Sequence, residues 1–137
     1  MSANLIRIHE LTDLMASGEW VNAHFIINDD GCEGVVADCL FGDATHIILK
    51  WYMPAGSSMG LHVHEHSREI LTCVEGEMPT RVGEQTHELK VGDSIIVDAG
   101  VPHGASRLFV EDSVIISITI PPAPEFVREG GDFGAKY

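Results

Sequence analysis

The chain has 137 residues, and 45% of them are hydrophobic. That is the length of one domain and enough to bury a full core without disulfide or metal staples. Its 21 acidic and 8 basic residues give a net charge of −13 at pH 7, and a surface this acidic repels phosphate backbones and anionic lipids. We therefore expect a single domain over residues 1–137 that contacts neither nucleic acid nor a membrane.

The first part of the chain has one helical pattern. In "HELTDLMASGEW", Leu11, Leu14 and Met15 lie at helical spacing, and Gly18 is a plausible stop. This predicts one short N-terminal helix. The first 20 residues lack the basic start and apolar run of a signal peptide, and no apolar run in the sequence is long enough to span a bilayer.

The cysteines point to a reducing compartment. Cys32, Cys39 and Cys73 are odd in number and form no CxxC pair, which is typical of reduced, partly buried thiols. With no targeting segment in view, we expect a cytoplasmic protein.

The remainder of the chain has the pattern of short strands. Strand-like segments cover residues 44–53, 68–78, 86–93, 94–104 and 113–120, and turn signals such as "PAG", "VGD" and "DAGVPHG" divide them. This spacing is typical of an all-β sandwich or barrel, with a core over about residues 45–122. In "SVIISITI", Ser113, Ser117 and Thr119 share one face with Ile115, and a barrel can turn such a polar face toward an internal cavity.

Three histidines at alternate positions stand out in "GSSMGLHVHEHSREILTCVEG", residues 56–76. On a regular strand His62, His64 and His66 would point the same way. Glu69 would then face the opposite side, and it joins the histidines only if the chain turns or bulges at "EHSR".

A further ligand has to come from elsewhere in the chain. The candidate is His103 in "GVPHG", where Gly100 and Pro102 predict a tight turn just before it. Histidine and carboxylate ligands suit Fe, Mn, Co, Ni, Cu or Zn rather than Ca or Mg. His9, His24, His46 and His87 have no such partner spacing.

These segments resemble the two signature motifs of the cupins. The first match runs from Gly56 through His62, His64 and Glu69 to Gly76, and the second, "GDSIIVDAGVPH", runs from Gly92 to His103. The resemblance implies a small RmlC-like jelly roll, also called a double-stranded β-helix, and one divalent transition metal held by His62, His64, Glu69 and His103. It also implies that His66 is not a ligand.

A narrower resemblance concerns the segments "VGDSIIVDAGVPHG" and "EDSVIISITIPPAPEF". They are similar to KdgF-type cupins, which handle unsaturated uronic acids. Those proteins usually have glutamine where this chain has Glu69. The resemblance implies a sugar acid or a similar small, oxygen-rich anion as the substrate.

Arg107 leaves two interpretations open. It shares strand parity with His103 and Ala105, so its guanidinium could bind a substrate carboxylate beside the metal. Alternatively, it is a surface arginine among the many acids.

The expected function is that of a metal-dependent enzyme, an isomerase, tautomerase or dioxygenase, with Glu69 and His66 as the candidate catalytic groups. The alternatives are a non-catalytic cupin that binds a small ligand or a metal, and a structural domain with an incidental metal. The resemblance, together with residues 45–53 taken as an apolar edge strand, also predicts a homodimer.

Overall fold

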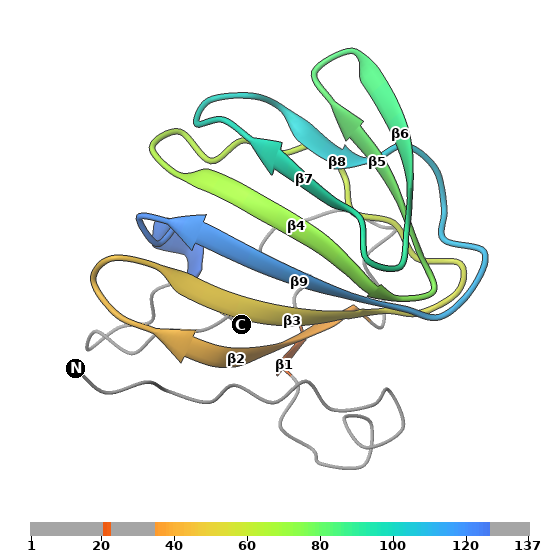
Figure 1. The fold of residues 1–137 in the computed structure, drawn as a ribbon, viewed down its shortest axis with the longest axis horizontal. Coiled ribbons are helices and arrows are strands. Elements are labelled where there is room, and N and C mark those ends of the chain that lie inside the picture. Colours follow the sequence, from red (N-terminus) through yellow and green to blue (C-terminus); the bar gives the residue numbers. More distant parts are fainter. Residues whose placement is uncertain (1–20, 23–34, 127–137) are drawn as a thin grey trace.

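The structure is a computed structural model, and it describes residues 21–22 and 35–126. Nine strands and one short 3-10 helix form this part of the chain (Figure 1). They are β1 (Val21–Asn22), β2 (Val36–Gly42), β3 (Ile47–Met53), β4 (Arg68–Glu75), β5 (Glu77–Val82), β6 (Gln85–Lys90), β7 (Ser94–Val97), β8 (His103–Ala105), β9 (Ser113–Ile120) and the 3-10 helix η2 (Pro124–Phe126). The expected N-terminal helix lies outside the described residues. Among the described residues, no helix is long and apolar enough to cross a membrane.

The strands form two antiparallel sheets that close over one core. One sheet has the order β1-β2-β3-β9-β4-β7 and the other has the order β6-β5-β8. In Figure 1 the smaller sheet folds over the upper end of the larger one. The core joins both sheets, because Met78 of β5 belongs to the same buried cluster as Leu49 of β3 and Ile115 of β9. The expected all-β jelly-roll barrel is confirmed.

The inner face of the larger sheet combines apolar and polar side chains, as the alternation predicted. From β3, Ile47, Leu49 and Met53 are fully buried, and from β9 so is Thr119. Ser117 on β9 accepts a hydrogen bond of 2.8 Å from the Trp51 indole nitrogen, which satisfies both polar groups inside the barrel.

A glycine makes the sharp connection between β4 and β5 possible. Gly76 has a φ of 75°, a left-handed conformation that favours glycine. A Cβ atom at this position would also lie 2.6 Å from the carbonyl oxygen of Asp112. Gly76 therefore permits the approach of this connection to the start of β9.

The outer face of the larger sheet bears a row of isoleucines. Ile48, Ile118, Ile70 and Ile96 are cross-strand neighbours over β3, β9, β4 and β7, and Ile96 is 59% exposed. We call these four residues the isoleucine row. The prediction that residues 45–53 form an edge strand was wrong, because β3 pairs with β2 on one side and β9 on the other.

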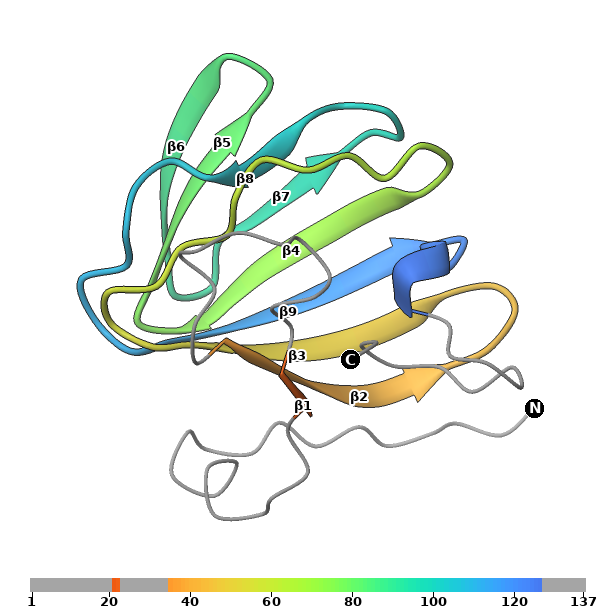
Figure 2. The ribbon, with the colours of Figure 1, turned by 180° about the vertical axis from the view of Figure 1, so that it is seen from behind.

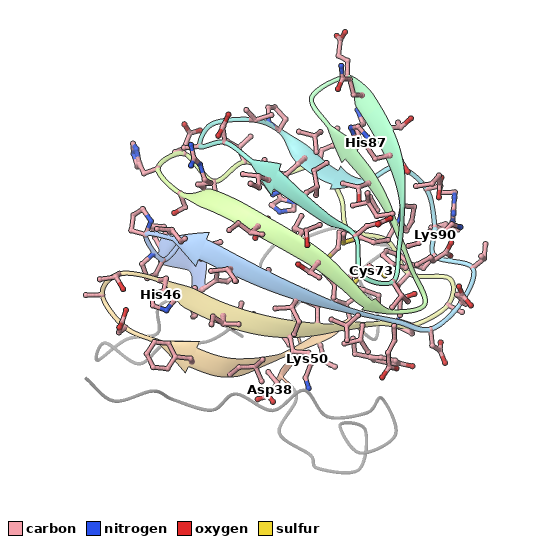
Figure 3. All side chains as sticks on the ribbon, in the orientation of Figure 1. Asp38, His46, Lys50, Cys73, His87 and Lys90 are labelled. Atoms are coloured by element: carbon pink, nitrogen blue, oxygen red, sulfur yellow. The ribbon has the colours of Figure 1, made fainter. Side chains whose placement is uncertain are left out.

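The same outer face of β3 carries Lys50, which is opposite Asp38 of β2 (Figure 3). Lys50 is fully buried, and burial lowers the pKa of its amine below the ordinary value of 10.5, while Asp38 and Glu75 oppose that shift.

Candidate metal centre

Four sequence-predicted residues lie together inside the barrel. His62, His64, Glu69 and His103 each offer one ligand atom, and these atoms all lie within 4.8 Å of one another. His64, Glu69 and His103 are at most 4% exposed, and His62 is half-buried.

The chain reaches this arrangement by a bend rather than by a regular strand. Residues 62–66 do not form the strand that the alternation of histidines suggested, and the chain bends at Glu65 and His66. The bend ends the alternation, so Glu69 at the start of β4 turns to the same site as His64. His66 itself is exposed.

The segment that carries His62 runs alongside β8 (Figure 2). His62 and His103 exchange two backbone hydrogen bonds of 2.9 and 3.0 Å, and Ala105 donates another, of 2.7 Å, to the carbonyl of Met59. This pairing fixes the separation of two site histidines through the backbone.

The turn before His103 is present where Gly100 and Pro102 predicted it. Gly100 has a φ of 81°, and Val101 donates a backbone hydrogen bond of 3.2 Å to Asp98. The amide of Gly100 also donates a hydrogen bond of 2.9 Å to the carbonyl of His64. The turn therefore ties His103 to the backbone of a second site residue.

Backbone carbonyls orient two of the imidazole rings. The Nδ1 atom of His62 lies 2.8 Å from the carbonyl oxygen of Gly60, and Nδ1 of His103 lies 2.9 Å from that of Val101. A carbonyl can only accept, so both Nδ1 atoms donate. Ligating histidines usually donate their second nitrogen in this way, which leaves Nε2 for the ion.

Glu69 supplies the negative charge of the site. Its Oε1 atom lies 2.8 Å from Nε2 of His103, and its Oε2 atom lies 3.6 Å from Nε2 of His64. Burial lowers the pKa of His62 to about 4, with a further contribution from His103. Burial also acts to lower the pKa of His103, but the hydrogen bond and the charge of Glu69 outweigh it and raise that pKa above 6.5.

The site opens on a cavity, which we call the barrel pocket. The empty space within the pocket and in the solvent at its open mouth amounts to about 590 Å³. Its polar side chains among the described residues are His62, Glu69, Thr80 and His103. Eight large apolar side chains also line it: Trp51, Met53, Met59, Leu71, Met78, Phe109, Ile115 and Phe126.

Phe126 links η2 to the site. Its ring centroid lies 5.6 Å from that of His64 and 5.8 Å from that of Trp51. No local sequence pattern marks Phe126 as a pocket residue.

Arg107 lies apart from the four candidate metal ligands. β8 ends at Ala105, so the strand alternation that aligned Arg107 with His103 does not continue. The guanidinium donates hydrogen bonds of 2.8 Å to Glu77 and 2.7 Å to Glu88, and Arg107 does not line the barrel pocket. This arrangement corresponds to the alternative interpretation, an arginine among the acids.

Two of the histidines without partner spacing also lie apart from the site. His46 precedes β3 and bonds with Thr45, and His87 lies on β6 opposite Thr80. Figure 3 shows these two histidines on different parts of the molecule. Neither belongs to the metal-ligating group of the described residues.

The chain belongs to the cupin family, because the family model described as "Cupin domain" matches residues 49–119. A quercetin 2,3-dioxygenase of Bacillus subtilis is 28% identical over 96% of this chain and 40% of its own length. The transcriptional regulator PuuR of Escherichia coli is 31% identical over 55% of this chain, and again over 40% of its own length. The chain thus spans about 40% of the length of these curated relatives.

Solved structures agree with the fold. An RmlC-like cupin from Shewanella frigidimarina is 28% identical, with a TM-score of 0.63 over 69% of this chain and 82% of that one. KdgF from a Halomonas species is 20% identical, with a TM-score of 0.65 over 72% of this chain and 89% of that one. At this identity the second likeness concerns the fold alone.

Proposed function

We propose that this protein is a metal-dependent enzyme whose divalent transition metal is held by His62, His64, Glu69 and His103. The observation that carries the proposal is the convergence of four ligand atoms within 4.8 Å at the wall of a pocket. The donor set fits such an ion, since imidazole and carboxylate suit Fe, Mn, Co, Ni, Cu and Zn.

The surrounding residues are suited to holding these ligands in place. Gly60 and Val101 orient His62 and His103 through their carbonyl groups, and Phe126 packs against the ring of His64. A bound ion would supply Lewis acidity toward a small molecule in the barrel pocket. Glu69 is the candidate catalytic group that lies beside this pocket, whereas His66, the other candidate, is exposed.

Dioxygen chemistry is the reaction class that we favour. The similarity to quercetin 2,3-dioxygenase extends over 96% of this chain, whereas the similarity to KdgF is one of fold. Isomerisation or tautomerisation of a sugar acid is the second candidate, and non-catalytic ligand binding is the third. The sugar-acid hypothesis depended in part on Arg107, whose guanidinium is engaged by Glu77 and Glu88.

Two wider expectations remain part of the proposal. A homodimer through the isoleucine row would cover apolar surface that includes an Ile96 side chain 59% exposed. A cytoplasmic location is compatible with the free thiol of Cys73. Burial raises the pKa of the Cys73 thiol to about 11, which makes it unreactive.

Metal binding and oxygen uptake test the central proposal. Metal-free protein is titrated calorimetrically with Fe(II), Mn(II), Co(II), Ni(II) and Zn(II), and we expect one equivalent of at least one ion to bind. Oxygen consumption is then followed with an electrode while candidate substrates are added. If no ion binds, the metal centre is excluded. If the protein binds metal and converts a substrate without consuming oxygen, the dioxygenase class is excluded.

A further inference from the structure

The wall of the barrel pocket is apolar beyond the site itself. Trp51, Phe109 and Phe126 contribute aromatic surface, and these three residues are at most 4% exposed. Their rings cannot turn outward to solvent without repacking the core. The wall that a ligand would meet is therefore fixed as hydrocarbon surface.

Methionines line the same pocket. Met53, Met59 and Met78 come from β3, from the β3–β4 connection and from β5. Methionine is unbranched and has a polarizable sulfur, so it adapts to irregular ligand shapes and packs well against aromatic rings. A wall of this kind suits a range of apolar bodies rather than one outline.

A polyhydroxylated molecule would be poorly accommodated in this pocket. Every buried hydroxyl that lacks a partner loses its hydrogen bonds to water. Apart from the candidate ligands, Thr80 is the polar side chain among the described lining residues, and its hydroxyl already donates to the carbonyl of Met78. No lysine or arginine of the described residues lines the pocket.

We infer that the substrate is a neutral small molecule with an apolar, preferably aromatic, body and one compact pair of oxygen atoms directed at the metal. This inference rests on the proposed function, because the oxygen pair requires the ion at His62, His64, Glu69 and His103. It replaces the expected sugar acid by a different chemical class.

Three hydroxamic acids test the inference, because they share one metal-binding head and differ in the attached group. They are acetohydroxamic acid with a methyl group, benzohydroxamic acid with a phenyl ring and gluconohydroxamic acid with a polyhydroxylated chain. Each is titrated by calorimetry into protein loaded with its tightest-binding divalent ion. We expect the phenyl compound to bind about tenfold or more tightly than the methyl compound, because the ring buries more apolar surface. The polyhydroxylated compound should bind no more tightly than the methyl one.

A pair of variants in one loop localises the effect. Met59→Gln keeps the side-chain length but places an amide in the pocket, whereas Leu61→Gln makes a similar change at a residue that is 51% exposed and does not line the pocket. We expect Met59→Gln to lose most of the phenyl preference and Leu61→Gln to keep it. Both variants should retain wild-type metal content.

The outcomes separate this inference from the proposed function. The protein could bind metal and yet bind the three hydroxamic acids equally tightly, or bind the polyhydroxylated one most tightly. Either result would overturn the apolar-substrate inference and leave the metal centre intact. Absence of metal would overturn the proposed function. In that case benzamide and acetamide are titrated into the metal-free protein: preference for benzamide supports the apolar pocket, and equal binding overturns it.

Discussion

Gly104 lies where β8 packs against the loop that carries the metal-ligand candidate His62. It follows His103 in β8, and the loop that carries His62 passes directly over it. A Cβ atom on Gly104 would lie 2.6 Å from the carbonyl oxygen of Gly60 and 2.8 Å from that of Met59. To restore ordinary contacts of 3.4 Å, the loop must retreat by about 0.6–0.8 Å. The obstructing atoms belong to the backbone, so no change of rotamer relieves the clash.

Gly104→Ala should therefore reduce both stability and metal affinity. Overpacking of this kind costs about 1–3 kcal/mol of unfolding free energy. The carbonyl of Gly60 also orients the ring of His62 through a bond of 2.8 Å, and loss of such a support lowers metal affinity by about 10–100-fold. Urea unfolding of the metal-free protein measures the first effect, and calorimetric metal titration measures the second.

Gly83→Ala is the matched control for this substitution. Gly83 has a φ of 59°, and a Cβ atom there would meet nothing within 4 Å. It should reduce stability through backbone strain while metal affinity stays at the wild-type value. Wild-type metal affinity in Gly104→Ala would refute the coupling between this glycine and His62, and unchanged stability would refute the close approach itself.

The remaining predictions concern the barrel interior, an ion pair and the outer face. Ser117→Ala leaves the buried Trp51 nitrogen without its acceptor and should cost about 1–3 kcal/mol in urea unfolding. The hydrogen bond from Arg107 holds the pKa of Glu77 below 4.5, so this pair stabilises the fold above pH 4.5 and the contribution is lost as the pH falls through the lower folded-state pKa. The urea midpoint should therefore fall less between pH 7 and pH 3 in Arg107→Gln than in the wild type, and equal falls would refute this role. Ile96→Asp should convert the proposed homodimer to a monomer in light scattering, and a wild-type monomer at micromolar concentration would contradict the dimer.

The fold was predictable because the strand signals are local. Apolar alternation in residues 47–53 and 113–120 identified β3 and β9 and even the polar inner face with Ser117 and Thr119. The neighbours of each strand were not predictable in the same way, because pairing depends on contacts between distant segments. This is why residues 45–53 were taken for an edge although β3 lies inside the sheet.

The residues of the candidate metal site could be predicted from the sequence better than the residues around it. The resemblance to the two cupin motifs implied that His62, His64, Glu69 and His103 meet, and the turn at "EHSR" that Glu69 requires is present as the bend at Glu65 and His66. Nothing local revealed the position of Arg107, because its direction depends on where β8 ends and on the carboxylates of Glu77 and Glu88.

The pocket wall depended on long-range packing as well. Phe126 reaches His64 only because η2 folds back after β9, and a proline-rich strand end with no periodic pattern does not encode that return. Met59 and Met78 likewise come together from different elements. The apolar character of the pocket, and with it the inferred substrate class, therefore required the structure.

Metal stoichiometry tests most directly whether His62, His64, Glu69 and His103 hold one metal ion. Wild-type protein, His64→Ala and His66→Ala are each loaded with the same ion, dialysed and assayed by elemental analysis, and circular dichroism verifies that each is folded. His64 is buried beside Glu69 and His66 is exposed. We expect one equivalent of metal in the wild type and in His66→Ala, and none in His64→Ala. Two results would contradict the proposed site. In one, His66→Ala loses metal as completely as His64→Ala; in the other, His64→Ala retains a full equivalent of metal.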